Sequence, residues 1–479
     1  MEQIIQGRRP ASVFRYFEQI SAIPRGSHNE SGIADYLVAF AKERGLEYYR
    51  DSLHNVLIKS PATDGQEKRP PLLFQGHTDM VCEKNSDVEH DFFSDPLSLF
   101  VDGKLLRARG TTLGADNGIA VAIMLALLDG EVAEHPAFEC LFTTAEETGL
   151  NGAQNFDYGL IKSRTMINMD SEELGVVTCG CAGGLRSDLT LHCATTPFAG
   201  QALRVRIGGL MGGHSGADVN TGRANANKLM GRLLAALLPS CDARIVSIAG
   251  GSKDNAIPRE CEVVLAVADV DAATDILTGT ANEIARELIK EDRGFTVTVE
   301  TAEDEAVMMS RRDTERICAV LACAACGVLA MNQSVSGLVE YSRNLGVVRT
   351  EGDDVTFVFS SRSGIESRLD ASICEIDALA NALGGKTDHY SRYPGWDFVS
   401  ESAVREAYVK AYRDVTGKDA TINVIHAGLE CGIIYSKLPD MDIISIGPDT
   451  YDVHSPDEAL DLESTETFWK TLERLIEIV

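Results

Sequence analysis

Residues 72–81 read LLFQGHTDMV. The residues before His77 are apolar or amide and predict a buried strand, which ends in a glycine and a His-x-Asp pair. Because α/β proteins place their chemistry at the ends of strands, His77 and Asp79 are candidate functional residues. Both side chains fall on one side of the pleat, so one can bind a metal while the other orients it. A surface pair is the alternative, since a single His-x-Asp is common.

Helices and strands alternate on both sides of this stretch. The pattern predicts helices at 10–23, 31–45 and 119–128, and strands at 55–59, 71–75, 138–144 and 165–170. Residues 119–128 are apolar nearly all round, which is typical of a helix buried between two layers. The expected fold class is α/β, with a mixed, mostly parallel sheet sandwiched by helices.

The middle of the chain has a different pattern. It predicts an α+β region with a half-exposed antiparallel sheet. The predicted strands are 202–207, 243–249, 260–270, 295–301 and 355–359, and the predicted helices are 224–238, 273–290 and 314–329. From about residue 392 the first pattern returns, with helices at 401–416 and 464–478 and strands at 420–426 and 442–446.

Four acidic residues follow His77 in strand-end contexts, and a second histidine lies much later: Asp116, Glu146, Glu147, Asp170 and His454. Taken singly, Asp116 could cap a helix and the others could lie in solvated turns or loops. Taken together, the carboxylates would repel one another unless a cation compensates them, and this donor set suits zinc. The number of ligands suggests two metals that share a carboxylate. Adjacent Glu146 and Glu147 are expected to divide the roles of metal ligand and free general base.

The order of these residues predicts the domain organisation. Asp170 and His454 lie 284 positions apart (454 − 170), with no ligand-like signal between them. The last ligand must therefore come from a segment that rejoins the first sheet. We expect a catalytic domain formed by 1–190 and 391–479, and an inserted domain at 191–390.

Composition excludes several classes of partner. The 479 residues exceed one ordinary domain, and 44% hydrophobic residues allow full cores. A net charge of −28, from 72 acidic and 44 basic residues, argues against nucleic acid and anionic membranes. We find no apolar run of 18 residues and no secretory h-region, so a cytoplasmic location is expected.

The twelve cysteines are scattered along the chain. Those in apolar segments, such as Cys140, Cys261 and Cys318, are expected to be reduced core residues. Cys323 and Cys326 form a C-x-x-C, but both fall in the helix predicted at 314–329. A packed helix face is therefore favoured over zinc or redox chemistry.

Several short motifs carry a resemblance to a known family. They are GHTD at 76–79, GADNG at 114–118, TAEETG at 144–149, NMD at 168–170 and VHSP at 453–456. This set resembles the co-catalytic zinc peptidases of the aminoacylase and carboxypeptidase type. GGHSG at 212–216 and HAGLECG at 426–432 narrow the resemblance to the aminoacyl-histidine dipeptidase branch (PepD-type cytosolic nonspecific dipeptidases), over essentially the whole chain.

The resemblance implies a role for each motif residue of the catalytic domain. His77 and Asp170 would bind one Zn2+, and Glu147 and His454 the other. Asp116 would bridge the two metals, and the peptide bond that follows it would be cis. Co2+ or Mn2+ could replace Zn2+. Asp79 would orient His77, and Glu146 would be the general base that takes a proton from a metal-bridging water.

The resemblance also implies that the inserted domain is a lid that forms a homodimer. His214 would reach the partner's active site and stabilise the oxyanion, and Asn255 and Arg362 would grip the substrate. A glycine-loop histidine and a strand-end surface charge remain alternatives for His214 and Arg362. Gly428 and Glu430 are candidate substrate contacts; Glu430 would pair with the free amino group, or be a buried structural acid.

The expected activity is hydrolysis of unblocked dipeptides, both Xaa-His and broader. An N-acyl amino acid deacylase, a carboxypeptidase or a tripeptidase of the same site plan is the nearest alternative. A noncatalytic metal-binding scaffold of the same fold is another, although Glu146 and all five ligand positions are present. A dinucleotide-binding enzyme is disfavoured, because no glycine fingerprint follows the first strand.

Overall fold

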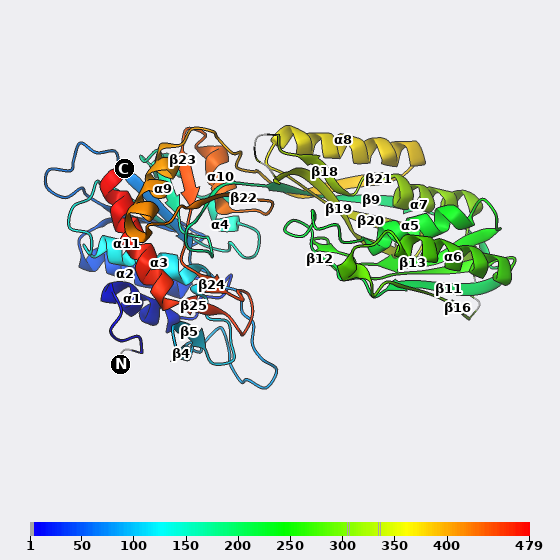
Figure 1. The fold of residues 1–479 in the computed structure, drawn as a ribbon, viewed down its shortest axis with the longest axis horizontal. Coiled ribbons are helices and arrows are strands. Elements are labelled where there is room, and N and C mark those ends of the chain that lie inside the picture. Colours follow the sequence, from blue (N-terminus) through cyan, green and yellow to red (C-terminus); the bar gives the residue numbers. More distant parts are fainter. Residues whose placement is uncertain (1–3, 304, 306, 334, 336) are drawn as a thin grey trace. The chain divides into compact units, whose positions relative to one another are not determined.

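A computed structural model of the chain describes residues 4–303, 305, 307–333, 335 and 337–479. The chain forms two compact units (Figure 1). The first unit combines Met1–Cys181, Trp396–Val424 and Leu429–Val479; the second combines Ala182–Gly395 and Ile425–Gly428. The domain limits expected near residues 190 and 390 fall inside strands β9 (Gly183–His192) and β21 (Lys386–Tyr393) of the second unit.

The large sheet of the first unit is mixed. Its described strands lie in the order β1-β2-β6-β3-β7-β23-β8-β22. Their bounds are β1 (Glu47–Arg50), β2 (Val56–Ser60), β3 (Leu72–His77), β6 (Phe138–Thr143), β7 (Thr165–Asn168), β8 (Val176–Cys181), β22 (Thr421–Ile425) and β23 (Asp442–Ser445). The neighbours β6, β3, β7 and β23 run parallel, whereas β1, β2 and β8 pair antiparallel with their neighbours. The carboxyl ends of the four parallel strands therefore meet at one edge.

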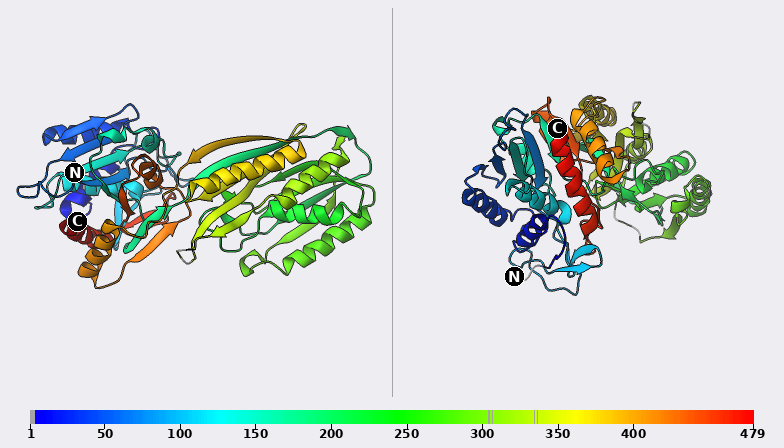
Figure 2. Two further views of the ribbon diagram at one scale, coloured as in Figure 1. Left: turned by 90° about the horizontal axis from the view of Figure 1, so that it is seen from above. Right: turned by 60° about the vertical axis from the view of Figure 1, so that its left-hand side comes forward.

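Helices cover both faces of this sheet, which confirms the predicted fold class. One face shares a hydrophobic core with helices α1 (Ala11–Ser21), α2 (Ser31–Glu43), α3 (Ala115–Leu128), α9 (Ala403–Thr416) and α11 (Leu462–Ile478). Phe74 of β3 lies in this core, and its neighbour Gln75 points to the opposite face, toward α10 (Glu430–Lys437). As the apolar pattern predicts, α3 is buried on all sides after its first turn. Helices α9 and α11 lie side by side (Figures 1 and 2).

A smaller sheet completes the first unit. Its order is β24-β25-β5-β4, with bounds Thr450–Tyr451, Ala459–Asp461, Leu105–Ala108 and Leu99–Asp102. Strands β24 and β25 pair antiparallel, so residues 452–458 form the loop that joins them. Strand β25 also pairs with β5, which leads into the segment before α3.

The second unit has one large antiparallel sheet, as predicted. Its strands lie in the order β16-β11-β15-β13-β19-β20-β9-β21, and β18 also pairs with β19. The bounds not yet given are β11 (Gln201–Gly208), β13 (Ala243–Gly250), β15 (Cys261–Val267), β16 (Thr296–Thr301), β18 (Gly327–Met331), β19 (Val339–Glu351) and β20 (Asp354–Ser363). Helices α5 (Ala226–Leu237), α6 (Val270–Ala285), α7 (Arg311–Cys323) and α8 (Glu366–Leu383) share a core with one face. The left view of Figure 2 shows these helices along the sheet.

The helix predicted at 314–329 is wrong in its second half. Helix α7 ends at Cys323, because the backbone at Ala324 leaves the helical region (φ −59°, ψ 124°). Gly327 has a φ of +95° and begins strand β18, which pairs with β19. Cys323 is exposed and Cys326 lies in the turn, where its sulfur accepts the Leu345 N–H at 3.4 Å. The C-x-x-C is therefore not a packed helix face.

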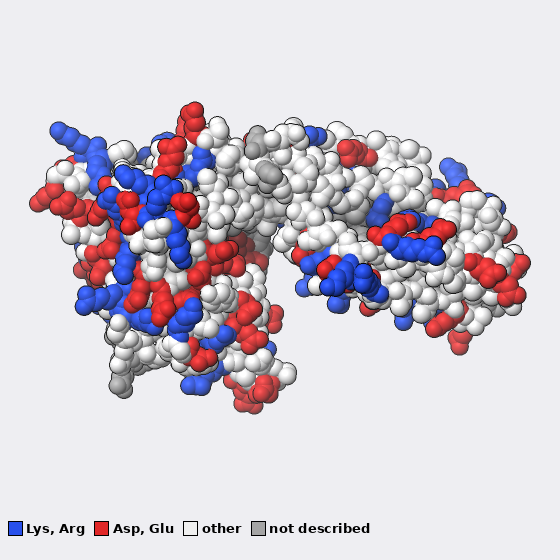
Figure 3. Space-filling model, viewed as in Figure 1, with Lys and Arg blue, Asp and Glu red and all other residues white. Residues whose placement is uncertain are grey.

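The other cysteine predictions are confirmed for Cys140, Cys261 and Cys318, which are buried and unpaired. No helix in the described part of the chain combines the length and apolar character needed to cross a membrane. On the face seen in Figure 3, the basic side chains of the first unit are interspersed with acidic ones.

Candidate metal centre

Strand register places the candidate residues of the first unit at one edge of the large sheet. His77 is the last residue of β3, and it pairs with Thr143 at the end of β6. On the other side of β3, Gln75 pairs with Asn168 at the end of β7. Glu146, Glu147 and Asp170 follow the ends of β6 and β7, so the parallel pairing brings their backbones to His77.

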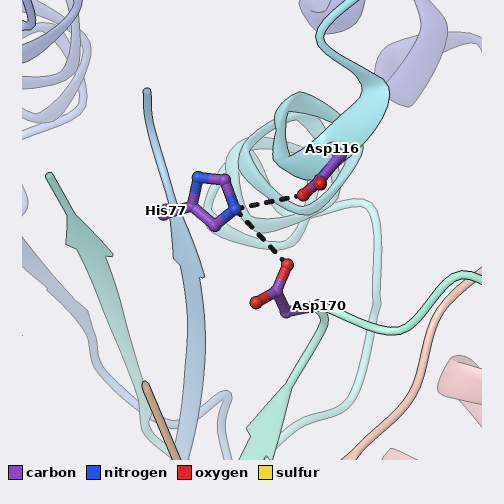
Figure 4. A group of neighbouring side chains, drawn as sticks. All are labelled: His77, Asp116 and Asp170. Atoms are coloured by element: carbon purple, nitrogen blue, oxygen red, sulfur yellow. Dashed lines mark hydrogen bonds and ion pairs between the residues drawn. The ribbon is translucent and has the colours of Figure 1, made fainter. Parts of the chain in front are cut away.

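His77, Asp116 and Asp170 form one group of possible metal ligands (Figure 4). His77 is buried, and its Nε2 lies 3.1 Å from Asp116 Oδ1 and 3.4 Å from Asp170 Oδ1. Asp116 lies in the first turn of α3, where its backbone is not helical, and the Asp116–Asn117 peptide bond is cis as expected. Gly76 allows Asn117 to lie close to the end of β3, because a Cβ at residue 76 would meet Asn117 Oδ1 at 2.4 Å.

The second oxygen of Asp116 faces the other histidine. Asp116 Oδ2 lies 3.1 Å from His454 Nε2, and the same nitrogen is 3.1 Å from Glu147 Oε1. Asp116, Glu147 and His454 thus form a second group of possible ligands, with donor atoms within 4.8 Å of one another. One carboxylate therefore presents an oxygen to each of two histidines, which is the arrangement that a carboxylate shared by two metals requires.

Asp79 connects His77 to the end of β6. It is buried, and its carboxylate accepts the backbone N–H groups of Glu146 at 3.1 Å and Glu147 at 3.3 Å. Asp79 also accepts the Ser27 hydroxyl at 2.8 Å, and its Oδ1 lies 3.5 Å from His77 Nδ1. Asp79 contacts the ring nitrogen of His77 that does not face Asp116.

Glu146 lies beside both groups. One of its carboxylate oxygens is within 4.8 Å of a His77 nitrogen and of a Glu147 oxygen. Burial raises the pKa of Glu146 well above its usual value, and the nearby acids Asp170, Glu430 and Glu147 add to the shift. Glu146 therefore combines a position next to the ligands with the raised pKa of a general base.

The charges of this cluster fit a bound cation. Burial raises the pKa of Asp170 and of Glu147, and the charge of Asp116 adds to both shifts. Such carboxylates are costly to ionise together unless a positive charge lies between them. Imidazole nitrogen and carboxylate oxygen are donors that Zn2+ accepts, and Mg2+ or Ca2+ would favour oxygen alone.

Three charged residues near this cluster are absent from the candidates found in the sequence. Burial, followed by Asp116 and Asp170, raises the pKa of Glu172 to about 7. Arg25 and Glu458 are both buried and contact the segment before Asp116. For Glu458, the signal was its position four residues after His454; nothing in the sequence marks Arg25 as buried.

The second unit brings His214 and Arg362 together. His214 Nδ1 accepts the N–H groups of Gly216 at 3.3 Å and Ala217 at 3.0 Å, so Nε2 carries the proton of the neutral ring. Burial, then the Arg362 charge, lowers the pKa of His214, which favours the neutral ring. His214 Nε2 lies 3.4 Å from Arg362 Nη2, so two donors face each other. Arg362 Nε is also buried and has no partner among the described residues.

The other two candidates of the second unit are Asn255 and Gly428. Both lie near this pair, and their contacts involve backbone atoms rather than side chains. Asn255 uses its backbone carbonyl to accept the Ser215 N–H at 2.8 Å, next to His214. Gly428 makes room for Tyr393, because a Cβ there would meet the Tyr393 ring at 2.8 Å. The Tyr393 hydroxyl in turn accepts the Arg362 Nη1–H at 3.1 Å. Gly428 thus acts on Arg362 through Tyr393.

Glu430 lies in the first unit, fully buried behind the metal centre. Its Oε2 accepts the Gln75 amide and the Thr143 hydroxyl, both at 2.6 Å. Its Oε1 has no partner among the residues that the structure describes. Burial, above all, raises the pKa of Glu430 to about 7. These contacts are those of a structural acid; pairing with a substrate amino group would have to use Oε1.

The sequence and the fold are similar to those of known proteins. Residues 73–478 match the family described as Peptidase family M20/M25/M40. The chain is 36% identical over 471 residues to the cytosol non-specific dipeptidase of Escherichia coli strain K12, and the match covers 98% of this chain and 97% of the relative.

Solved structures of similar proteins have the same fold. The aminoacylhistidine dipeptidase of Vibrio alginolyticus is 37% identical, with a TM-score of 0.92 over 99% of this chain and 97% of that chain. The aminopeptidase PepT of Bacillus cereus, 15% identical with a TM-score of 0.56 over 97% of each chain, shares the fold. The chain therefore belongs to peptidase family M20/M25/M40 and is a hydrolase that acts on peptide bonds.

Proposed function

We propose that this hydrolase is a dizinc dipeptidase that cleaves unblocked dipeptides, including Xaa-His. The observation that carries this proposal is the Asp116 carboxylate, which presents one oxygen to His77 and the other to His454. The two similar proteins, named as a non-specific dipeptidase and an aminoacylhistidine dipeptidase, support the substrate class. A cytoplasmic location would follow from the same likeness.

The ligands divide into two sets that share one residue. His77 and Asp170 would hold one zinc, Glu147 and His454 the other, and Asp116 would bind both. Bound there, zinc supplies a Lewis acid for the scissile carbonyl and lowers the pKa of water to near neutrality. Asp79 would keep His77 in the tautomer that leaves Nε2 free to bind.

Glu146 would move the proton in the reaction. It takes a proton from the attacking water as the water oxygen bonds to the carbonyl carbon. The same proton then passes to the amide nitrogen as the C–N bond breaks, which releases an amine and a carboxylic acid; the acid then gives its proton to the amine, leaving an ammonium and a carboxylate. Burial raises the pKa of Glu146 above that of an exposed glutamate, which suits a group that both accepts and returns a proton.

His214 and Arg362 would bind the negative charges of the substrate. Their facing N–H groups lack a common acceptor, and an anionic oxygen would satisfy both. A dipeptide offers two such oxygens, the oxyanion that develops at the carbonyl and the terminal carboxylate. We assign the oxyanion to His214 and the carboxylate to Arg362, with Asn255 as a further contact on the adjacent loop.

A pocket of about 570 Å3 in the first unit adjoins Glu147 and would receive a side chain of the dipeptide. Its lining includes Met80, Phe92 and Phe93, with Lys84 and Asp91 also present. The lining mixes these apolar side chains with polar and charged ones, so it offers contacts to side chains of different kinds rather than to one residue type. This agrees with broad specificity.

Replacing Arg362 by lysine should raise KM about 10- to 100-fold and change kcat less. Lysine keeps the charge but lacks the planar fork, and one charge-assisted hydrogen bond contributes about 1.5–3 kcal/mol. Steady-state kinetics on one dipeptide measure the effect. Arg349→Lys is the matched control, since Arg349 is an exposed arginine of β19 that pairs with Glu351. Equal KM values for Arg362→Lys and the wild type would contradict the assignment.

The second unit would also form a homodimer, in which His214 acts on the partner's site. Mixed dimers of His214→Ala and Glu146→Gln protomers should then recover activity, because one of the two sites combines an intact base with an intact histidine. Differently tagged protomers, purified through both tags, provide the heterodimer for assay. Purified heterodimers without activity would place His214 in its own subunit's site.

A substrate panel with defined metals tests the proposed function. The protein is stripped with a chelator, reloaded with Zn2+, Co2+ or Mn2+, and assayed on free dipeptides, N-acetylated amino acids, blocked dipeptides and tripeptides. We expect loss of activity on stripping, recovery with each metal, and a preference for free dipeptides. Preference for acylated amino acids would favour a deacylase, and preference for longer or blocked peptides a tripeptidase or carboxypeptidase. A metal-loaded protein without any activity would favour a scaffold.

A further inference from the structure

The carboxylate of Glu458 holds the backbone that leads into Asp116. Its Oε2 accepts the N–H groups of Leu113 at 2.7 Å and Gly114 at 2.9 Å. Its Oε1 accepts those of Ala115 at 2.8 Å and Asp116 at 3.3 Å. Glu458 is 2% exposed, so these four donors share a carboxylate that water hardly reaches.

Arg25 holds the same segment from its other side. Its Nη2 donates to the Gly114 carbonyl at 2.5 Å, and its Nη1 donates to the Thr78 carbonyl at 3.0 Å. Gly114 has a φ of +65°, and a Cβ there would meet Arg25 Nη2 at 2.6 Å. Gly114 is thus gripped through its N–H by Glu458 and through its carbonyl by Arg25. The two buried charges compensate each other across one peptide.

This clamp, formed by Arg25, Gly114 and Glu458, connects three ligand-bearing segments. Arg25 reaches the segment after His77, and both charges contact the segment before Asp116. Glu458 belongs to the same 452–458 loop as His454, and its N–H donates to the Ser455 carbonyl at 3.1 Å. The next residue, Ala459, is fixed by pairing with Arg107 of β5. Movement of Glu458 would therefore shift Asp116 and His454 relative to each other.

We propose that Glu458 is a positioning residue, which together with Arg25 sets the two oxygens of Asp116 so that each faces its own histidine. The proposal rests on the proposed function, because it concerns the metals that Asp116 would share. A purely structural alternative is that Glu458 only caps the N-terminus of α3. Such a cap would affect the stability of the fold but would not weaken one metal more than the other.

Metal titration of the stripped protein separates the two roles. Co2+ is added to wild-type protein and to Glu458→Gln, and the bound equivalents are followed by calorimetry and by the visible absorption of Co2+. Glutamine replaces one acceptor oxygen by an NH2 group that opposes the backbone N–H donors. We expect the second equivalent to bind about 10- to 100-fold more weakly, as is usual for groups that hold metal ligands in place, and the Co2+ spectrum to change.

Asp461→Asn is the matched control. Asp461 is also 2% exposed and accepts the N–H groups of Glu463 at 2.9 Å and Ser464 at 3.0 Å, where it caps α11. Its carboxylate also pairs with Lys104 at 2.6 Å, and none of these described partners lies in a segment that bears a candidate ligand. The variant should bind both equivalents as the wild type does. If Glu458→Gln does not fold, Arg25→Lys replaces it, since lysine cannot reach both carbonyls at once.

The outcomes are distinct. Wild-type binding of both equivalents by Glu458→Gln, or by Arg25→Lys in its place, would overturn the positioning role alone. The same loss in Asp461→Asn would also overturn it, because the effect would then be general destabilisation. A wild type that binds fewer than two equivalents would overturn the proposed two-metal function, and the positioning role with it.

Discussion

Glu146→Gln is expected to lower kcat by about 100- to 10,000-fold while the metal content stays that of the wild type. Glutamine has the shape of glutamate but cannot accept the proton of the attacking water. Glu146 also falls in a possible ligand group with His77 and Glu147, but the two groups that contain Asp116 do not include it, so metal binding should persist if Glu146 is the base. Steady-state assays on a free dipeptide, with elemental analysis of the same sample, measure both quantities.

Glu147→Gln is the contrasting variant. Glu147 lies one residue further along the chain and contacts His454, so its loss should weaken metal binding as well as turnover. Near-normal turnover in Glu146→Gln would remove the base assignment. Equal loss of metal in both variants would mean that the two adjacent acids do not divide their roles.

Asp116→Asn should weaken the binding of both metals and remove nearly all activity. Only one oxygen remains after the change, and the amide nitrogen that replaces the other cannot serve as a ligand to the second metal. In this variant His77 and His454 would face a neutral amide, in place of the negative charge that they share in the wild type. Titration with Co2+ should show weakened binding at both steps, and the dipeptidase assay should show a loss of several orders of magnitude.

Asp170→Asn provides the comparison for that experiment. Asp170 contacts His77 but not His454, so its replacement should weaken one binding step and spare the other. If Asp116→Asn and Asp170→Asn weaken the same single step, Asp116 is not shared between two metals.

The candidate metal centre could be predicted from the sequence because it depends on strand ends. A parallel sheet brings the carboxyl ends of its strands together, so His77, the Glu146–Glu147 pair and Asp170 needed only their strands to be recognised. The wide separation of Asp170 and His454 likewise predicted a returning segment, and β23 does lie beside β7.

Other parts could not be predicted, for physical reasons. Residues 314–329 have helical composition throughout, but pairing of β18 with β19 overrides that preference after Cys323. The roles of Arg25 and Glu458 depend on backbone groups, which every sequence offers alike. Only the left-handed backbone at Gly114 makes those groups accessible, and glycine alone does not reveal it.

Glu430 illustrates a different limit. The sequence showed it only as an acidic residue within a motif, which left both a substrate contact and a structural acid open. Its partners, Gln75 and Thr143, lie on the face of the sheet opposite the main core, and a face is assigned only once the register is known.

The 452–458 loop has a consequence for how the protein is made. His77 leaves the ribosome 377 residues before His454 (454 − 77), which corresponds to about 20–75 s of synthesis at usual rates. From Asp170 onward, over the last 284 residues of that interval (454 − 170), the nascent chain carries His77, Asp116, Glu147 and Asp170 without His454 and without Glu458 to hold Asp116. The second unit is complete at Gly428, 26 residues before His454 (454 − 428), whereas binding of the proposed second metal would wait until translation is nearly finished. In the proposed function, incorporation of the second metal would thus be a late step in maturation.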